Sequence, residues 1–168
     1  MSTVESGKMF PIRERSVPEE VYLVEKRDEE QILKSMRGEI VKDWVYQFTQ
    51  NGRQITALSY AGVKEAIRQR GNISWYPCEC CHRPVHYDID ESEIRVQVTA
   101  WDVERNMKFL GAASSNRKLP FAWVIAVNKA ERNALRKFLP EKQIALLIDE
   151  WLRKENKNPP LVPPGRIG

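Results

Sequence analysis

The chain has 168 residues, enough for one domain, with 42% hydrophobic residues and a net charge of +4. This apolar share is ordinary for a globular core and excludes a wholly disordered protein. No apolar run approaches the roughly 20 residues of a membrane span, and the N-terminus lacks the apolar stretch of a secretory signal. Three cysteines, an odd number, argue against a secreted disulfide scaffold. We therefore expect a soluble, intracellular protein with no membrane partner.

The N-terminal third predicts an arm, a helix and a β-hairpin. Residues 1–18 are polar and contain two prolines, which predicts a loosely held arm. Residues 28–36 are expected to form a short helix, because the segment begins with acidic residues, which are favourable at a helix N-terminus. Apolar residues alternate over 39–49, and an Asn-Gly pair at 51–52 precedes a second extended run at 53–58. Asn-Gly favours a tight hairpin turn because both of its residues accept a positive φ.

The next helix is expected over residues 60–70, with both of its ends marked. Ser59 can cap its N-terminus, and Gly71 can end it in the left-handed conformation. A strand follows at 73–76, and after the segment 78–86 the extended pattern resumes.

Residues 94–103 alternate cleanly between apolar and polar side chains, which predicts a half-buried strand. The pair Arg105-Asn106 turns the chain into a partner strand at 108–113. These runs predict a second antiparallel hairpin.

From residue 120 the apolar period becomes helical and holds to 139, and a further helix is expected over 141–154. Residues 155–168 carry four prolines and predict an extended tail. The chain therefore predicts a single domain over 19–154. Its expected class is α+β, with an antiparallel sheet of β-hairpins packed against a long amphipathic helix.

The long helix carries a basic stripe. Lys129, Arg132 and Arg136 fall within roughly 60° of one another, opposite the apolar face, by helical geometry. The three neighbouring cations repel one another, which destabilises the helix, and a bound phosphate backbone would neutralise that repulsion. A solvated surface face is the alternative interpretation. Glu131 points toward the apolar side and would need a partner there.

Two further features of the chain have both a binding and a structural interpretation. Lys64 and Arg68 lie four residues apart on the earlier helix, a spacing that is equally common on a plain surface. Trp75, Tyr76 and Trp101 can stack on bases, each contributing about 1–3 kcal/mol. Their place in alternating strands favours core packing instead.

All cysteines and both histidines of the chain lie within residues 78–86. Cys78 and Cys81 have the C-x2-C spacing of zinc sites, with His82 and His86 following. Against a closed site, Cys81 and His82 are adjacent, and the chain has no second C-x2-C pair. A loop with free thiols is the favoured interpretation, and a structural zinc ion is the alternative.

Acids at 88, 90, 91 and 93 raise the alternative of a metal-dependent nuclease. They are more typical of a polar turn between two strands. The chain has no glycine-rich phosphate loop, so no nucleotide cofactor is indicated. We therefore expect that the protein is not an enzyme.

Three segments occur in an order that resembles a known family. They are LSYAGVKEAIRQRGNISW, IRVQVTAWDVERNMKFLGAAS and KAERNALRKFLP, and the match covers roughly residues 40–139. In this order they resemble the core of the Rad-fifty-two-type single-strand annealing proteins. Phage annealing proteins of the Erf and Sak type share the same plan.

The resemblance implies homo-oligomeric rings that hold single-stranded DNA in a basic groove. Carried over residue by residue, the groove positions are Lys64, Arg132 and Arg136. Asn133 stands where the family has a second cation, and Lys137 lies nearby. The Cys/His segment has no counterpart in the family.

The resulting hypothesis is a DNA-associated, non-catalytic protein that promotes ATP-independent annealing in homologous recombination and DNA repair. The expected DNA-binding residues are Lys64, Arg68, Lys129, Arg132, Arg136 and Lys137. The alternatives are the metal-dependent nuclease and a zinc-stabilised interaction module.

Overall fold

A computed structural model describes residues 19–41 and 43–157. Four helices and six strands lie in this part of the chain. In order they are α2 (Glu19–Met36), β1 (Val45–Gln50), β2 (Arg53–Leu58), α3 (Tyr60–Arg70), β3 (Ile73–Tyr76), β4 (His86–Ile89), β5 (Glu93–Asp102), β6 (Met107–Asn116), α4 (Ala122–Arg136) and α5 (Glu141–Lys157).

The strands β1 and β2 form a two-stranded antiparallel hairpin whose register runs from Val45 opposite Leu58 to Gln50 opposite Arg53. Its turn residues Asn51 and Gly52 have φ values of 51° and 76°. The tight turn expected from the Asn-Gly pair is therefore confirmed.

The larger sheet is built around β5 and is antiparallel throughout. Along one side, β6 pairs with the whole of β5. Along the other side, β3 pairs with the C-terminal half of β5 and β4 with the N-terminal half, where Tyr76 lies opposite Thr99 and His86 opposite Gln97. The expected α+β class with antiparallel hairpins is confirmed.

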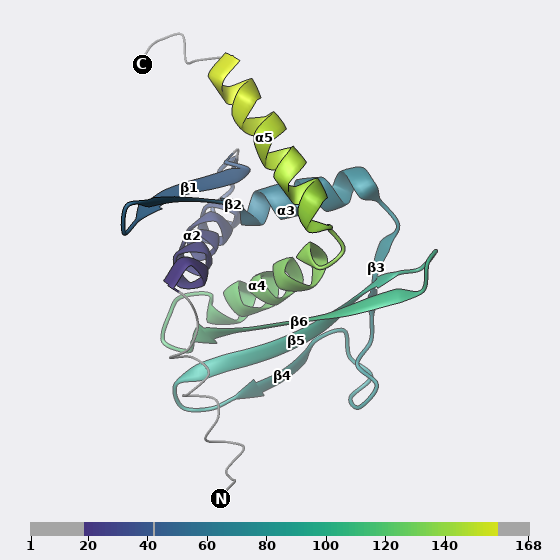
Figure 1. Ribbon diagram of the computed structural model, residues 1–168. Coiled ribbons are helices and arrows are strands. Elements are labelled where there is room, and N and C mark those ends of the chain that lie inside the picture. The colour runs from purple at the N-terminus through teal and green to yellow at the C-terminus, as the bar shows by residue number, and fades with distance from the viewer. Residues whose placement is uncertain (1–18, 42, 158–168) are drawn as a thin grey trace, which may run out of the picture.

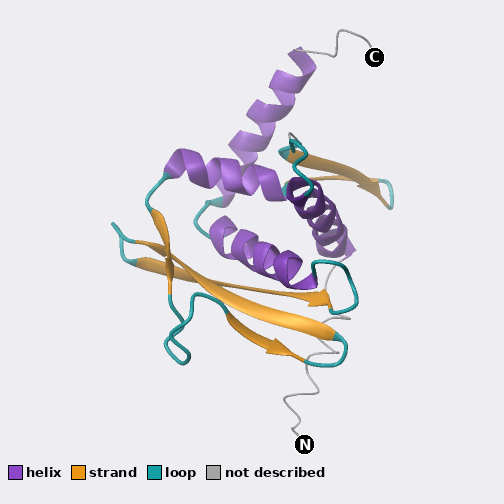
Figure 2. Cartoon of the chain, turned by 180° about the vertical axis from the view of Figure 1, so that it is seen from behind, coloured by secondary structure: helices purple, strands orange, loops and turns teal. Residues whose placement is uncertain are grey.

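The helices gather on one face of this sheet. In Figure 1, α4 lies directly over β5 and β6, with α2 and α3 packed beyond it. No described helix covers the opposite face, which is the lower one in Figure 2. The two faces of β5 differ accordingly, because Val96, Val98 and Ala100 are buried whereas Gln97 is exposed.

Small residues let α4 approach β6 very closely. A Cβ atom added at Gly111 would lie 2.1 Å from the backbone oxygen of Ala130 and 2.7 Å from the Cβ of Ala134. Ala126, Ala130 and Ala134 are fully buried along this contact. Only glycine fits at position 111 while the helix keeps this distance.

The boundaries of α3 agree with the expectation from the sequence. The Ser59 side chain accepts a hydrogen bond from the backbone N–H of Gly62, and Gly71 ends the helix at φ 74°. The expected cap and glycine stop are both confirmed.

The first helix and first strand differ from their expected ranges. α2 begins at Glu19, nine residues before the expected helix over 28–36. β1 begins only at Val45, because Ile40 is 81% exposed and takes no part in the sheet. The prediction of a strand over 39–49 was therefore wrong in its first half.

The long helix expected over 120–139 is shorter than predicted. α4 has 15 residues and is followed by a turn before Pro140, whereas α2 has 18 and α5 has 17. A single dominant long helix is therefore not present in the described part of the chain.

At the C-terminal end, α5 continues to Lys157, three residues into the region expected as tail. The expected arm over 1–18 and the rest of the tail lie outside the described residues. Within the described part, none of the helices combines the length and apolarity that crossing a bilayer requires.

Candidate functional site

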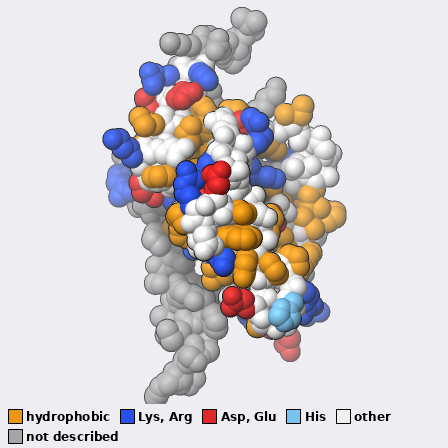
Figure 3. Space-filling view, turned by 90° about the vertical axis from the view of Figure 1, so that its right-hand side faces the viewer, with side chains coloured by type: hydrophobic (Ala, Val, Ile, Leu, Met, Phe, Trp, Pro, Cys, Tyr) orange, Lys and Arg blue, Asp and Glu red, His pale blue; other side chains and the backbone are white. Residues whose placement is uncertain are grey.

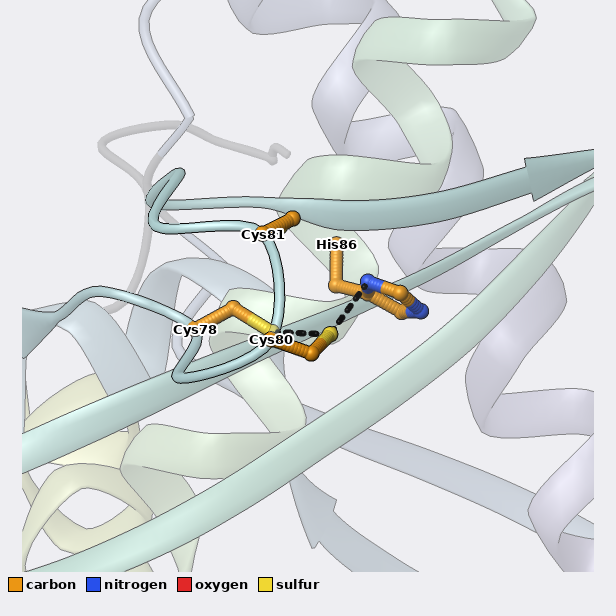
Figure 4. Close-up of side chains that lie close together, drawn as sticks. All are labelled: Cys78, Cys80, Cys81 and His86. Carbon is orange, nitrogen blue, oxygen red and sulfur yellow. Dashed lines mark hydrogen bonds between the residues drawn. The ribbon is translucent and has the colours of Figure 1, made fainter.

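Four side chains with metal-binding atoms meet in the loop between β3 and β4. Their ligand atoms all lie within 4.8 Å of one another; the residues are Cys78, Cys80, Cys81 and His86. The Sγ atoms of Cys78 and Cys80 are 3.0 Å apart, and Cys80 Sγ is 3.5 Å from His86 Nδ1, as the dashed lines in Figure 4 show. We call this set the Cys/His group.

Backbone hydrogen bonds fold this loop back on itself. The N–H of Cys78 donates to the carbonyl oxygen of Arg83 at 2.9 Å, and the N–H of His82 donates to that of Cys78 at 2.7 Å. His86 is the first residue of β4, so its backbone is held by pairing with β5. A tight loop and a sheet strand therefore bring the four donors together.

The size and chemistry of the Cys/His group fit a zinc ion. Zinc–sulfur bonds of about 2.3 Å in a tetrahedral site place neighbouring ligands about 3.8 Å apart. The contacts of 3.0 and 3.5 Å in the group are somewhat shorter than that value, and all its ligand atoms lie within 4.8 Å of one another. Three thiolates and an imidazole are a known structural zinc set and suit soft-ligand metals. The group can therefore bind a metal ion.

Local hydrogen bonds prepare two of the thiols for ligation. The hydrogen bond from the Cys80 thiol, followed by backbone N–H groups, lowers the pKa of Cys78. A backbone hydrogen bond at Arg83 lowers the pKa of Cys81. The same thiol–thiol contact raises the pKa of Cys80. Because the thiolate is the metal-binding form, the loop favours the ligating state of Cys78 and Cys81.

The structure brings together three of the four residues expected to bind metal, Cys78, Cys81 and His86. His82 was also expected, but it takes a left-handed φ of 60° in the turn and lies outside the Cys/His group. Cys80 takes its place. The C-x2-C motif joins Cys78 and Cys81 and does not include Cys80. The presence of three cysteines within four residues would have indicated that Cys80 belongs to the same site.

Lys129 and Arg132 on α4 are buried and paired with acids of α2. Lys129 Nζ lies 2.9 Å from Glu29 Oε2, and it also donates to the carbonyl oxygen of Ser114 at 2.9 Å. Arg132 Nε lies 3.0 Å from Asp28 Oδ2, and Arg132 Nη2 donates to the carbonyl oxygen of Leu58. Both cations therefore join α4 to the elements around it.

Asp28 is the centre of this buried network. Its Oδ1 accepts a hydrogen bond from the Tyr46 hydroxyl at 2.8 Å and another from the Tyr60 N–H at 2.9 Å. Burial raises the pKa of the Asp28 carboxyl, and the charge of Arg132 opposes that rise. One carboxylate thus connects α2, β1, α3 and α4.

The expectation of an exposed cationic stripe is wrong for Lys129 and Arg132. α2 packs against α4 and supplies Asp28 and Glu29. Lys129 also reaches the edge of the larger sheet at Ser114, and Arg132 reaches Leu58 at the end of β2. The first two acids of the predicted helix at residue 28 are therefore ion-pair partners of α4.

A row of three side chains on and just after α4 donates hydrogen bonds to backbone carbonyl oxygens along the outer edge of β6. Side chains at Lys129, Asn133 and Lys137 donate to the carbonyl oxygens of Ser114, Ala112 and Leu110, respectively. Steps of four residues along a helix and two along a strand have nearly equal length, about 6 Å. Lys137 is exposed, but its ammonium already has a backbone partner in this row.

The remaining expected DNA-binding residues lie at the surface in two places. Lys64 Nζ donates to the Tyr60 hydroxyl at 3.2 Å and lies near Glu131, whose pKa is raised by burial. Arg68 is exposed and pairs with Glu65 at 2.6 Å. These contacts place both cations on α3.

Arg136 lies elsewhere, in a groove of about 380 Å³ between β2 and α5. Its guanidinium is 3.1 Å from the exposed carboxylate of Glu141. Arg136 pairs with Glu141 and Lys64 with Tyr60, and no hydrogen bond or ion pair among the described residues joins the two cations.

Three of the four acids considered for a nuclease surround one arginine. Arg95 lies 2.6 Å from Asp88, 2.9 Å from Asp90 and 3.1 Å from Glu93. Backbone N–H groups of Glu93 and Ser92, together with Arg95, lower the pKa of Asp90. The acids thus form the polar connection between β4 and β5, with a fixed cation where a nuclease would hold metal.

No family model matches the chain, and no solved structure matches it. The chain is similar to an uncharacterized protein of Methanocaldococcus jannaschii, with 26% identity over 119 residues. The match covers 67% of this chain and 46% of that protein. The chain therefore spans about half the length of the curated relative that it matches.

Proposed function

We propose that the protein binds single-stranded DNA and promotes ATP-independent annealing of complementary strands in recombination and repair. It acts without catalysis, as a homo-oligomer, and holds a structural zinc ion in the Cys/His group. The zinc ion would cross-link the loop between β3 and β4 and so contribute to the stability of the folded state.

One observation carries this proposal: the three segments that resemble annealing proteins pack into a single unit. The first segment donates from the Tyr60 hydroxyl to Asn128 of α4 at 2.8 Å. Arg70, also in the first segment, pairs with Asp102 of the second at 2.7 Å. Gly111 of the second segment packs directly under Ala130 of the third. Their order along the chain therefore corresponds to a compact arrangement in space.

Exposed cations, and not the buried pair, would contact the phosphates. Lys64 and Arg68 are exposed and Arg136 is partly exposed; the partner of Arg136, Glu141, is exposed, and the partner of Arg68, Glu65, is half-buried. Exposed ion pairs contribute only about 0–1 kcal/mol, so a phosphate can replace the carboxylate while counterions are released from the strand. Lys129 and Arg132 would leave the half-buried Glu29 and the buried Asp28 unpaired if they turned toward DNA.

A salt titration of strand binding tests the cationic part of the proposal. Binding of a fluorescent oligothymidine strand by wild-type protein should weaken steeply as salt rises. The variant Lys64→Ala/Arg136→Ala should bind less tightly, with a slope of log K against log salt smaller by about 1.4, since each single-strand contact contributes about 0.7. The matched control is Arg153→Ala/Lys154→Ala, which removes two exposed cations from α5.

The proposal fails if the wild-type protein binds no strand, or if the two double variants lower the slope equally. Annealing of complementary strands without ATP, followed by sizing of the complex, tests the rest of the proposed activity. Incubation with magnesium or manganese should leave labelled strands uncut. Cleavage would support the nuclease instead.

A further inference from the structure

The open face of the larger sheet contains a hollow of about 300 Å³ beside the Cys/His group. Its floor and walls include side chains from β3, β5 and β6, namely Tyr76, Gln97, Thr99, Lys108 and Leu110. Cys78, Cys80 and His86 form the wall on the loop side. Figure 3 views the side of the molecule where β3 and this loop lie, and hydrophobic side chains gather in its middle with cations and acids interspersed around them.

Strand register explains why these side chains share one face. Tyr76 lies opposite Thr99, and Thr99 lies opposite Leu110 on the other side of β5. Trp101 lies opposite Lys108 in the same register. Residues two apart on β5 point to the same side of the sheet, so the row faces away from α4.

An aromatic pair and an ammonium group meet at one end of the hollow. The rings of Tyr76 and Trp101 are 5.4 Å apart in an edge-to-face arrangement. Lys108 Nζ lies 3.9 Å from the Tyr76 ring centroid and 5.7 Å from that of Trp101. Trp101 is held further by a hydrogen bond from its Nε1 to Asn106. The two rings therefore form a fixed platform that carries one long, exposed cation.

The contact between Lys108 and Tyr76 is exchangeable. Lys108 is exposed, and its contact with the Tyr76 ring is a cation–π interaction, which is weak in water. A nucleobase can therefore take the place of the ammonium over the ring while the ammonium moves to the neighbouring phosphate. Gln97 and Thr99 offer donors and acceptors to the edge of such a base. Glu79, also in the lining, can accept from a ring N–H group of the base, such as N3–H of thymine.

We propose that this hollow binds one base of a single-stranded DNA segment, with Tyr76 stacking on the base and Lys108 contacting the adjacent phosphate. The inference rests on the proposed function and adds the residues that recognise a base. It also gives the Cys/His group a position in the site, because three of its members form one wall.

Strand binding by two hollow variants of the full chain tests the inference. Tyr76→Leu should raise the dissociation constant for a fluorescent oligothymidine strand roughly 5- to 150-fold, the range found for loss of one base stack. Lys108→Gln should weaken binding less and reduce the salt slope by about 0.7. Lys108 is exposed, so this second variant remains informative if Tyr76→Leu does not fold.

Tyr22→Leu is the matched control. Tyr22 is also exposed and also lies under a lysine, with Lys26 Nζ 5.5 Å from its ring centroid, but it belongs to α2. Its removal should leave strand binding unchanged. Photo-crosslinking of a 5-iodouracil strand should place adducts on Tyr76 or Trp101.

The possible outcomes separate this inference from the function on which it rests. If wild-type protein binds the strand and both hollow variants bind equally well, the hollow is not the base site and the proposed function stands. If wild-type protein binds no strand, both fail. If thymidine monophosphate binds in the hollow while Tyr76→Leu leaves the dissociation constant of the strand unchanged, the hollow is a nucleotide pocket and the inference is overturned.

Discussion

Two polar regions of this protein use similar side chains in opposite ways. Between α2 and α4, Arg132 and Asp28 are buried, and each charge finds its partner inside the protein. On the open face of the sheet, Lys108 lies over an aromatic ring beside the Cys/His group. The first region holds the helices together, and the second has binding groups that a ligand can still engage. A cation therefore indicates a binding site only where the fold has not already supplied its anion.

The free edge of β6 shows the same principle. Lys137 is exposed, yet its ammonium caps a backbone carbonyl in a row shared with Asn133 and Lys129. Occupied carbonyls make this edge a poor template for another strand. Exposure alone therefore does not make a cation available to a phosphate.

The sharpest test of the comparison is a pair of substitutions one helical turn apart on α4. Arg132→Met should lower the free energy of unfolding by about 3–5 kcal/mol, because it leaves Asp28 buried without its counter-charge. Arg136→Met should cost at most about 1 kcal/mol, because the pair with Glu141 is exposed. Chemical denaturation of both variants measures the difference. Equal losses would contradict the assignment of Arg132 to the interior.

The second test concerns the Cys/His group. Cys80→Ser should weaken zinc binding by more than about 100-fold, because it removes a ligand and not merely a hydrogen-bond partner of one. His82→Ala should bind zinc as the wild type does. Competition with a chelating dye measures both affinities. A larger loss in His82→Ala than in Cys80→Ser would restore the set expected from the C-x2-C spacing.

A pH-dependent stability is expected from the buried carboxylate at the end of β5. Hydrogen bonds from Arg70, then from the backbone and side chain of Arg105, lower the pKa of Asp102 from 3.8 to about 2. A lowered folded-state pKa contributes stability that is present above pH 3.8 and is lost as the pH falls toward about 2. The stability gap between wild-type protein and Asp102→Asn should therefore shrink over this window.

Denaturation of the two proteins at a series of acidic pH values measures that gap. A gap that stays constant between neutral pH and pH 2 would mean that the Asp102 carboxylate contributes nothing through its charge.

The smallest expected effect belongs to the capped edge. Asn133→Ala should lower the free energy of unfolding by about 0.5–1 kcal/mol, because it removes one partly solvated hydrogen bond to Ala112. The same variant should show more self-association, since one edge carbonyl becomes free. Denaturation and light scattering together measure the two effects. A loss above about 3 kcal/mol would place Asn133 in the core instead.

Features governed by neighbouring residues were predictable from the sequence. The Asn51-Gly52 turn, the Ser59 cap and the alternation along β5 all agree with the structure. Each depends on backbone conformation or on the two-residue period of a strand, which a short segment determines for itself. Three of the four members of the Cys/His group were also identified, because they lie close together in the chain.

Features governed by distant contacts were not predictable. The core packing expected for Tyr76 and Trp101 was wrong, because helices cover only one face of the sheet and these rings lie on the other. The start of β1 was also misplaced, since Ile40 fits the alternating pattern but has no strand beside it.

By itself the sequence determined that Lys129, Arg132 and Arg136 lie away from the apolar face of α4, since that follows from 3.6 residues per turn. Only the tertiary structure decided that α2 covers the first two and leaves the third in a groove at the surface. Glu29 and Lys129 are separated by 100 residues in the chain. An ion pair of that kind exists because two helices pack together, and no periodicity within either helix specifies it.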